Sequence, residues 1–160
     1  MSNSTRHTAR EAVLRALYIS ESREISVDEA FHEMEEIDRE ISLKPDAPYM
    51  RDLRPFSLQI HGSHLEFAMD LAHRVIDSRE ELSDIIKPLL KNWDFERLNR
   101  IDRLIMWIAL AEMRYQLDIP VSVTINEAVE LAKSYGSSKS PGFINGILDS
   151  AARQITGDAG

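Results

Sequence analysis

Residues 118–153 read DIPVSVTINEAVELAKSYGSSKSPGFINGILDSAAR, and this stretch predicts two helices joined by a short corner. Apolar residues in its first half repeat at the spacing of one helical face: Ile125, Ala128, Val129 and Ala132. The second half repeats the pattern up to residue 155: Phe143, Ile144, Ile147, Leu148, Ala151 and Ile155. Two amphipathic helices alone bury too little apolar surface to be stable, so the rest of the chain must cover them.

Polar residues and glycine mark the expected ends of these helices. Thr124, with Glu127 three residues later, has the form of a capping box. Gly136 is expected to end the first helix in a left-handed conformation. Ser140 and Pro141 then predict the N-cap and first position of the second helix, which leaves a polar corner between them.

The length and composition of the chain fit one soluble domain. The 160 residues are 43% hydrophobic, which is sufficient for a core without metal or disulfide support, and cysteine is absent. Residues 1–10 lack the apolar core of a signal peptide, and the longest apolar run, 104–111, is far shorter than the ~20 residues that span a bilayer. We expect a single cytoplasmic domain over 1–160, with a frayed tail at 157–160 and no membrane partner.

The negative charge is concentrated in one segment. The formal net charge is −8, but residues 21–40 hold nine acids against Arg23 and Arg39. The rest of the chain is therefore almost neutral, and residues 1–20 are positive. Because the acids fall on one face of a predicted helix, they say little about the charge of the other surfaces.

The remaining apolar periodicity predicts helices over about 5–20, 26–41, 63–77, 78–90 and 94–115. Ser78 with Glu81 has capping-box form, Asp94 is a candidate N-cap, and Pro88 should kink or end its helix. Residues 42–62 hold three prolines and predict a long loop. The expected fold class is all-α, a compact bundle of about seven helices in two small subdomains around a central apolar helix.

Residue types suited to catalysis or metal binding are present without the spacing that either needs. His61, His64 and His73 do not form a zinc-protease pattern, and a glycine interrupts the first pair. Glu112, Glu127 and Glu130 are candidate paired carboxylates, although Glu127 is already expected in a cap. Phosphate-binding loops and nucleophile motifs are missing, so we expect no enzyme, no metal and no cofactor.

Binding of nucleic acid is the remaining chemistry. Cations would contact phosphates, and an exposed aromatic ring would stack on unpaired RNA bases. The candidates lie on the first helix and at the corner: Arg6, His7, Arg10, Arg15, Lys139 and Phe143. The alternative is that the arginines are ordinary solvated surface and that Phe143 belongs to the core.

Three segments form patterns more specific than amphipathicity. They are AREAVLRALY at 9–18, NWDFERL with IDRLIMWIALAEM within 92–113, and IPVSVTINEAVELAKSYG with FINGILD within 119–149. In this order they resemble the NusB transcription antitermination family.

The resemblance implies an all-helical, non-catalytic adaptor. It implies binding to boxA-type single-stranded RNA and to NusE, a small-subunit ribosomal protein in its transcription role. The assembly then joins the RNA polymerase elongation complex with other Nus factors and suppresses termination, chiefly in ribosomal RNA operons. Carried over by position, the RNA contacts are Arg6, His7, Arg10 and Phe143, and the NusE contacts are Tyr18 and Asp102.

The chain departs from the family pattern in its cations. Family members often carry a denser basic run before the first motif, and a basic pair often stands where this chain has Pro141-Gly142. Fewer phosphate contacts weaken RNA binding, and Lys139 offsets part of that loss. The thin basic segment and the net charge of −8 therefore leave open a protein-only interaction module or homodimer of the same fold.

Overall fold

The computed structural model describes residues 2–92 and 94–155, so the predicted tail at 157–160 lies outside the described residues. These residues form seven α-helices and three short 3-10 helices, without a strand in the described ranges. The chain divides into two compact units, Met1–Ala72 and His73–Gly160. The helical content of the described residues confirms the all-α prediction.

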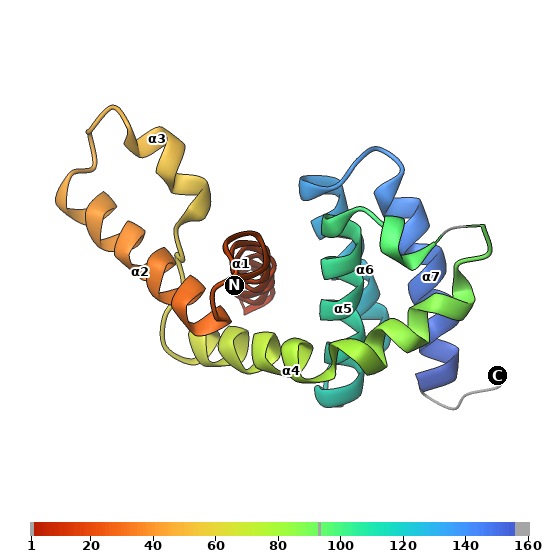
Figure 1. The fold of residues 1–160 in the computed structure, drawn as a ribbon. Helices are drawn as coiled ribbons and strands as arrows, with labels where there is room; N and C mark the ends of the chain where they lie inside the picture. Colours follow the sequence, from red (N-terminus) through yellow and green to blue (C-terminus); the bar gives the residue numbers. More distant parts are fainter. Residues whose placement is uncertain (1, 93, 156–160) are drawn as a thin grey trace. The chain divides into compact units, whose positions relative to one another are not determined.

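The first unit is built on the packing of α1 (Ser2–Arg23) against α2 (Val27–Leu43) (Figure 1). Both helices bury small side chains completely, which allows helices to approach closely: Ala9, Ala12, Ala16 and Ala30. Ser26 caps α2, because its hydroxyl accepts a hydrogen bond from the Glu29 amide at 3.1 Å. The acidic residues of α2 occupy the opposite face, as the sequence predicted, and each of them is exposed or half-buried.

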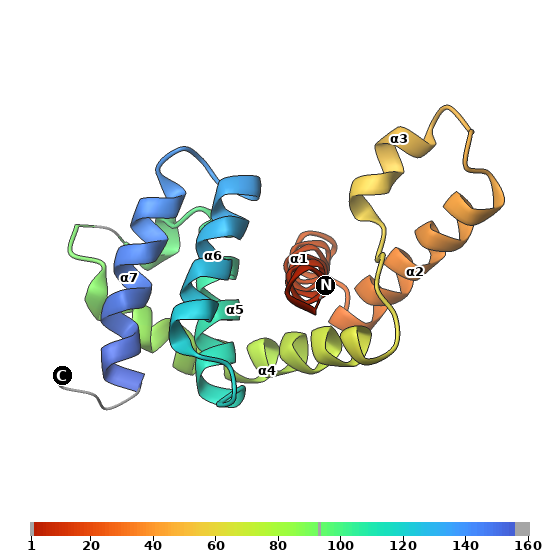
Figure 2. The same ribbon diagram turned by 180° about the vertical axis from the view of Figure 1, so that it is seen from behind.

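The segment predicted as a long loop, 42–62, contains two short helices, α3 (Met50–Leu53) and η1 (Arg54–Phe56). It also contributes buried side chains to the unit, at Met50, Leu58 and Ile60. The Asp38 carboxylate of α2 accepts hydrogen bonds from the amides of Leu58 and Gln59, both at 3.1 Å. The extended stretch that leads from η1 to α4 is therefore tied to α2 (Figure 2).

The second unit packs α5 (Arg100–Tyr115), α6 (Val121–Tyr135) and α7 (Ser140–Ile155) side by side, as both views show (Figures 1 and 2). Every residue of α5 from 104 to 113 is buried. An uninterrupted apolar run leaves a helix no face for water, so its burial follows directly from the sequence. The prediction of a central apolar helix is confirmed.

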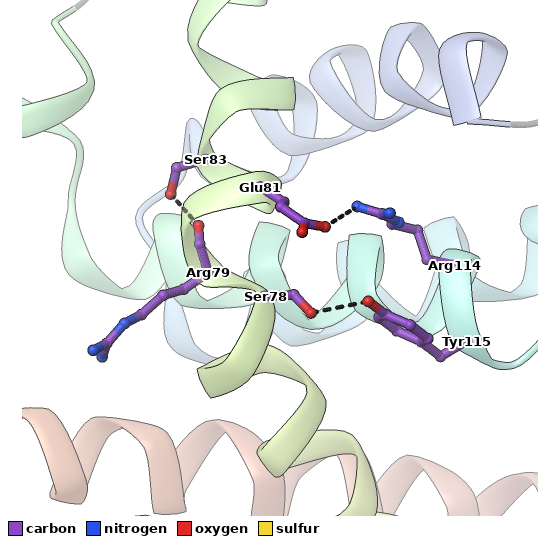
Figure 3. A network of polar contacts seen from close by, with 6 residues as sticks. All are labelled: Ser78, Arg79, Glu81, Ser83, Arg114 and Tyr115. Atoms are coloured by element: carbon purple, nitrogen blue, oxygen red, sulfur yellow. Dashed lines mark hydrogen bonds and ion pairs between the residues drawn. The ribbon is translucent and has the colours of Figure 1, made fainter.

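One long helix, α4 (Ser63–Ile86), replaces the two helices predicted over 63–77 and 78–90. Residues 63–72 belong to the first unit and 73–86 to the second. Ser78 is not a cap, because it lies inside α4, and its hydroxyl forms a hydrogen bond with that of Tyr115 at 3.0 Å (Figure 3). Glu81, its supposed capping partner, instead accepts a hydrogen bond from Arg114 at 2.9 Å. The helix ends before the 3-10 turn η2 (Lys87–Leu89), as Pro88 predicted.

Two further capping predictions are wrong. Asp94 caps only the 3-10 turn η3 (Phe95–Arg97), while the side chain of Asn99 caps α5 by accepting from the Ile101 amide at 2.8 Å. Thr124 lies inside α6, which follows Pro120 and has no side-chain cap. A motif specifies which residues are able to cap, but the packing of the helix decides where it begins.

Candidate nucleic-acid interface

The corner between α6 and α7 depends on the small size of Gly136. Its φ of −94° is not left-handed, so the expected left-handed helix end is wrong. A Cβ at this position would lie 2.7 Å from the Cβ of Ser140 and 2.9 Å from the carbonyl oxygen of Ala132. Glycine is thus required for a close approach of the two helix ends and not for backbone conformation.

Ser140 holds the corner from within α7. The helix begins at Ser140, so this residue is not the N-cap that the sequence predicted. Its hydroxyl accepts a hydrogen bond from the amide of Ser137 at 3.0 Å, and the two hydroxyl groups lie 3.2 Å apart. Since Ser140 is also buried, these contacts fix the path of residues 137–139.

An open pocket of about 340 Å³ lies within the second unit, between this corner and the start of α5. Its walls come from η3 and the first turn of α5 on one side and from the corner on the other: Arg97, Leu98, Asn99, Asp102, Ser137, Lys139, Ser140 and Phe143. The pocket therefore brings together three of the predicted site residues, Lys139, Phe143 and Asp102.

The pocket combines an aromatic ring, two cations and a buried carboxylate. Phe143 is half-buried, so part of its ring faces the open space and part belongs to the wall. Lys139 and Arg97 are exposed. Asp102 is only 9% exposed, and its Oδ1 has no hydrogen-bond partner among the described residues. Cations beside an accessible aromatic ring are the groups that hold single-stranded nucleic acid.

A second cavity in the same unit, of about 430 Å³, is less suited to a polyanion. Its cations Arg79 and Lys87 are accompanied by the carboxylates of Glu80 and Asp84. The indole N–H of Trp107, another wall residue, already donates to the Ser83 hydroxyl at 3.0 Å. The remaining wall residue is Phe95.

The predicted cations of α1 are engaged within the first unit to different degrees. Arg10 is only 3% exposed, so the alternative that it belongs to ordinary solvated surface is wrong. The ring of Phe67 on α4 lies 5.8 Å from its guanidinium and provides cation–π contact for the buried charge. Arg6 is exposed and lies over the same ring at 5.1 Å.

The other candidate residues on α1 also differ in their contacts and in their exposure. Arg15 donates a hydrogen bond to the carbonyl of Ser57 at 3.2 Å and so anchors the segment before α4. His7 lies 3.7 Å from the Glu11 carboxylate, one turn along the helix. Tyr18, the expected partner contact, is 40% exposed. His7 and Arg15 are half-buried, whereas Tyr18 is exposed.

The residues considered for catalysis or metal binding have structural surroundings. No cluster of three or more histidine, aspartate and glutamate side chains suited to a metal occurs in the part of the chain that the structure describes. Glu112 is buried and accepts a hydrogen bond from the Thr124 hydroxyl at 3.2 Å. Among the described helices, none is long and apolar enough to cross a membrane.

Sequence reasoning missed Arg97 and Asn99 as pocket residues. Both lie in or beside the segment NWDFERL, which was considered only for its resemblance to a family. Their position opposite the corner arises from the packing of α5 against α6 and α7, and no local pattern reports it.

An all-helical fold with cations and an aromatic ring around an open pocket presents the groups that non-catalytic nucleic-acid-binding adaptors use. Comparison with known proteins then identifies the family. The model of the NusB family matches residues 7–153, and the chain belongs to this family.

Relatives cover nearly the whole chain. The chain is 36% identical to the transcription antitermination protein NusB of Geotalea daltonii, over 95% of this chain and 97% of the relative. It is also 36% identical to that of Bacillus subtilis, over 94% and 96%.

Solved structures share the fold. NusB of T. maritima matches with a TM-score of 0.72 and 27% identity, covering 93% of this chain and 91% of that one. A structure of the antitermination factors NusB and NusE in complex with double-stranded RNA matches with a TM-score of 0.67. At 20% identity, over 94% of this chain and 98% of that one, the latter supports the fold alone.

Proposed function

We propose that this protein is a transcription antitermination factor that binds boxA-type single-stranded RNA together with NusE. The assembly acts on the RNA polymerase elongation complex, chiefly in ribosomal RNA operons. The observation that carries this proposal is membership of the NusB family over residues 7–153, with relatives of that name aligned over almost their whole length. The pocket beside the corner supplies chemistry suited to the same role.

In this proposal the RNA contacts are the corner pocket and Arg6 on α1. Phe143 stacks on a base, since every nucleobase has a π-face that an aromatic ring can cover. Lys139, Arg97 and Arg6 are exposed cations suited to phosphate oxygens. Arg10 and Arg15 act indirectly, because contacts within the first unit hold their guanidinium groups.

Tyr18 is the side chain on α1 best suited to the protein partner. It is one of the few large apolar side chains that remain exposed among the described residues. Tyrosine is enriched at protein interfaces because its ring gives contact area while its hydroxyl can still form a hydrogen bond. We therefore assign the NusE contact to the surface of α1 around Tyr18.

A mobility-shift titration tests the RNA part of the proposal. The protein is titrated into boxA-type single-stranded RNA, with and without NusE, at two salt concentrations. We expect a shift that strengthens with NusE and weakens with salt, since the release of counterions from RNA favours binding less at higher salt. No shift in either arm would contradict the proposal. A homodimer measured by light scattering would then favour the protein-only module.

Single-round transcription through a terminator tests the effect on RNA polymerase. The template carries a boxA element upstream of the terminator, and the reaction contains the other Nus factors. We expect read-through to rise when the protein is added and to fall back when boxA is scrambled. Equal read-through on both templates would contradict an action through boxA.

A further inference from the structure

One aromatic ring of the first unit contacts two arginines of α1. The guanidinium carbon of Arg6 lies 5.1 Å from the centroid of the Phe67 ring, and that of Arg10 lies 5.8 Å from it. Both distances are within the range of cation–π attraction. The two arginines are one helical turn apart, so they lie on the same face of α1. Phe67 belongs to the part of α4 within the first unit, so both contacts are internal to that unit.

The two contacts differ in what they leave accessible. Arg10 is buried, so the ring covers a charge that is already withdrawn from water. Arg6 is exposed, while Phe67 is half-buried. Arginine carries several N–H donors, and those that point away from a ring remain available to an anion. Phe67 therefore restrains Arg6 without removing its capacity to bind phosphate.

The stability of the fold accounts for the contact with Arg10 but not for the contact with Arg6. A buried charge requires a favourable environment, whereas water alone satisfies an exposed guanidinium. Restraint matters for binding, because a long side chain loses rotamer freedom when it is fixed on a ligand. A ring that already limits those rotamers lowers the entropic cost of binding. The contact with Arg6 is thus suited to binding more than to folding.

We infer that Phe67 is a positioning residue for RNA: it holds Arg6 in the orientation that contacts a phosphate, and it acts through Arg6 without touching RNA itself. This inference rests on the RNA binding proposed above. A backbone phosphate carries no sequence information, so the contribution of Phe67 is to affinity and not to the choice of base.

A double-mutant cycle between Phe67 and Arg6 tests this coupling. Affinity for boxA-type RNA in the presence of NusE is measured by fluorescence anisotropy for the wild type, Phe67→Leu, Arg6→Gln and the double variant. Leucine keeps much of the apolar volume and removes the ring face. We expect Phe67→Leu alone to weaken binding by about fivefold, the scale of the cost of ordering one long side chain. In the Arg6→Gln background the same change should have no further effect, because the side chain that the ring positions is absent.

Two further measurements separate positioning from the loss of a phosphate contact. Phe67→Tyr retains a ring face and should bind RNA as the wild type does. The slope of log affinity against log salt should fall by about 0.7 in Arg6→Gln, which loses a contact with phosphate. In Phe67→Leu the slope should be unchanged, since that contact still forms at a higher entropic cost.

The matched control is Phe56→Leu, which makes the same change at an exposed ring on η1 in the same unit. It should leave RNA affinity unchanged. Urea denaturation establishes conditions under which each variant is fully folded. Phe67→Met, with a longer apolar side chain, repeats the comparison if Phe67→Leu does not fold.

Three results would overturn the inference. Wild-type affinity in Phe67→Leu would show that the ring contributes nothing to RNA binding. Losses in Phe67→Leu and Arg6→Gln that add in the double variant would assign the ring to a direct RNA contact or to the fold. Failure of the wild-type protein to bind boxA-type RNA would overturn the proposed function itself, and the inference with it.

Discussion

The cations of α1 and those of the corner pocket teach different lessons, although both groups were candidates for RNA contact. On α1, Arg10 is buried beneath Phe67 and Arg15 is bonded to the Ser57 carbonyl. At the pocket, Lys139 and Arg97 are exposed, and neither forms an ion pair with another described residue. The number of cations on a segment is therefore a poor measure of how many are available to phosphate.

The difference has a physical origin. A long arginine side chain gains stability by packing its stem and placing its guanidinium over a ring or on a carbonyl. A cation that is buried or hydrogen-bonded in this way must give up those contacts before it can bind phosphate. An exposed lysine gives up only hydration, so the pocket cations should contribute more to RNA binding than their number suggests.

The largest expected effect is the loss of stability in Arg10→Glu. This change places a carboxylate against the Phe67 ring in a buried site, which should lower the free energy of unfolding by about 3 kcal/mol. Urea denaturation measures it. Lys139→Glu, the matched reversal at the exposed corner, should stay within about 0.5 kcal/mol of the wild type. Equal stability of the two variants would contradict the difference between the buried cation of α1 and the exposed cation of the corner pocket.

Gly136→Ala should have the next largest effect, because the added methyl group clashes with Ser140 and with the Ala132 carbonyl. Overpacking of this kind typically costs about 1–3 kcal/mol, and the displaced corner should also weaken RNA binding. Gly146→Ala is the control, since a Cβ there meets nothing within 4 Å and alanine favours a helix. Thermal melting and anisotropy report the two effects. A tolerated Gly136→Ala would show that the corner can shift freely.

Phe143→Ala should weaken RNA binding by about tenfold, since stacking on an aromatic ring contributes about 1–3 kcal/mol per base. Phe143→Leu retains much of the apolar volume in the wall and separates stacking from packing. Leucine should therefore preserve stability and still lose RNA affinity. If leucine binds RNA as well as the wild type does, the ring acts as part of the core and not as a stacking platform.

Arg15→Met should cost about 1 kcal/mol of stability through loss of the hydrogen bond to Ser57. The methionine stem retains the apolar packing of the arginine. RNA affinity, measured by anisotropy under conditions where the variant is fully folded, should not change. A clear loss of RNA affinity would show that Arg15 contacts RNA.

The smallest effect concerns Tyr49, whose hydroxyl donates to Glu40 at 2.9 Å. This hydrogen bond, together with desolvation and the charge of Glu40, raises the pKa of Tyr49 above its ordinary value of 10.0. The hydrogen bond stabilises the folded protein fully below pH 10.0. This stabilisation is lost as the pH rises through the raised pKa of Tyr49. Ultraviolet titration of Glu40→Gln should show Tyr49 ionising at lower pH than in the wild type. Identical titration curves would exclude the effect.

Apolar periodicity predicted the main helices because the spacing of apolar residues along the sequence shows which helix face is buried. The apolar run 104–111 predicted the central helix α5, and Pro88 predicted the end of α4. The cap motifs at Thr124 and Ser78 failed because their hydroxyls bond instead to the distant Glu112 and Tyr115. Such partners depend on packing between helices, which neighbouring residues do not reveal.

The candidate site was predictable only in part, for a related reason. Lys139 and Phe143 were found from their residue types and from the family resemblance, and the structure places both at one pocket. Arg97 was missed because it reaches that pocket from the turn before α5. The burial of Arg10 was missed because the ring that covers it comes from α4.

The salt dependence of RNA affinity tests most directly the claim that the pocket cations, and not Arg15, bind phosphate. Affinity for boxA-type RNA with NusE is measured from low to moderate salt for the wild type, for Arg97→Gln with Lys139→Gln, and for Arg15→Gln. Each lost phosphate contact lowers the slope of log affinity against log salt by about 0.7 for single strands. We expect the double variant to lower the slope by about 1.4 and Arg15→Gln to leave it unchanged. A normal slope in the double variant, or a reduced slope in Arg15→Gln, would contradict this account.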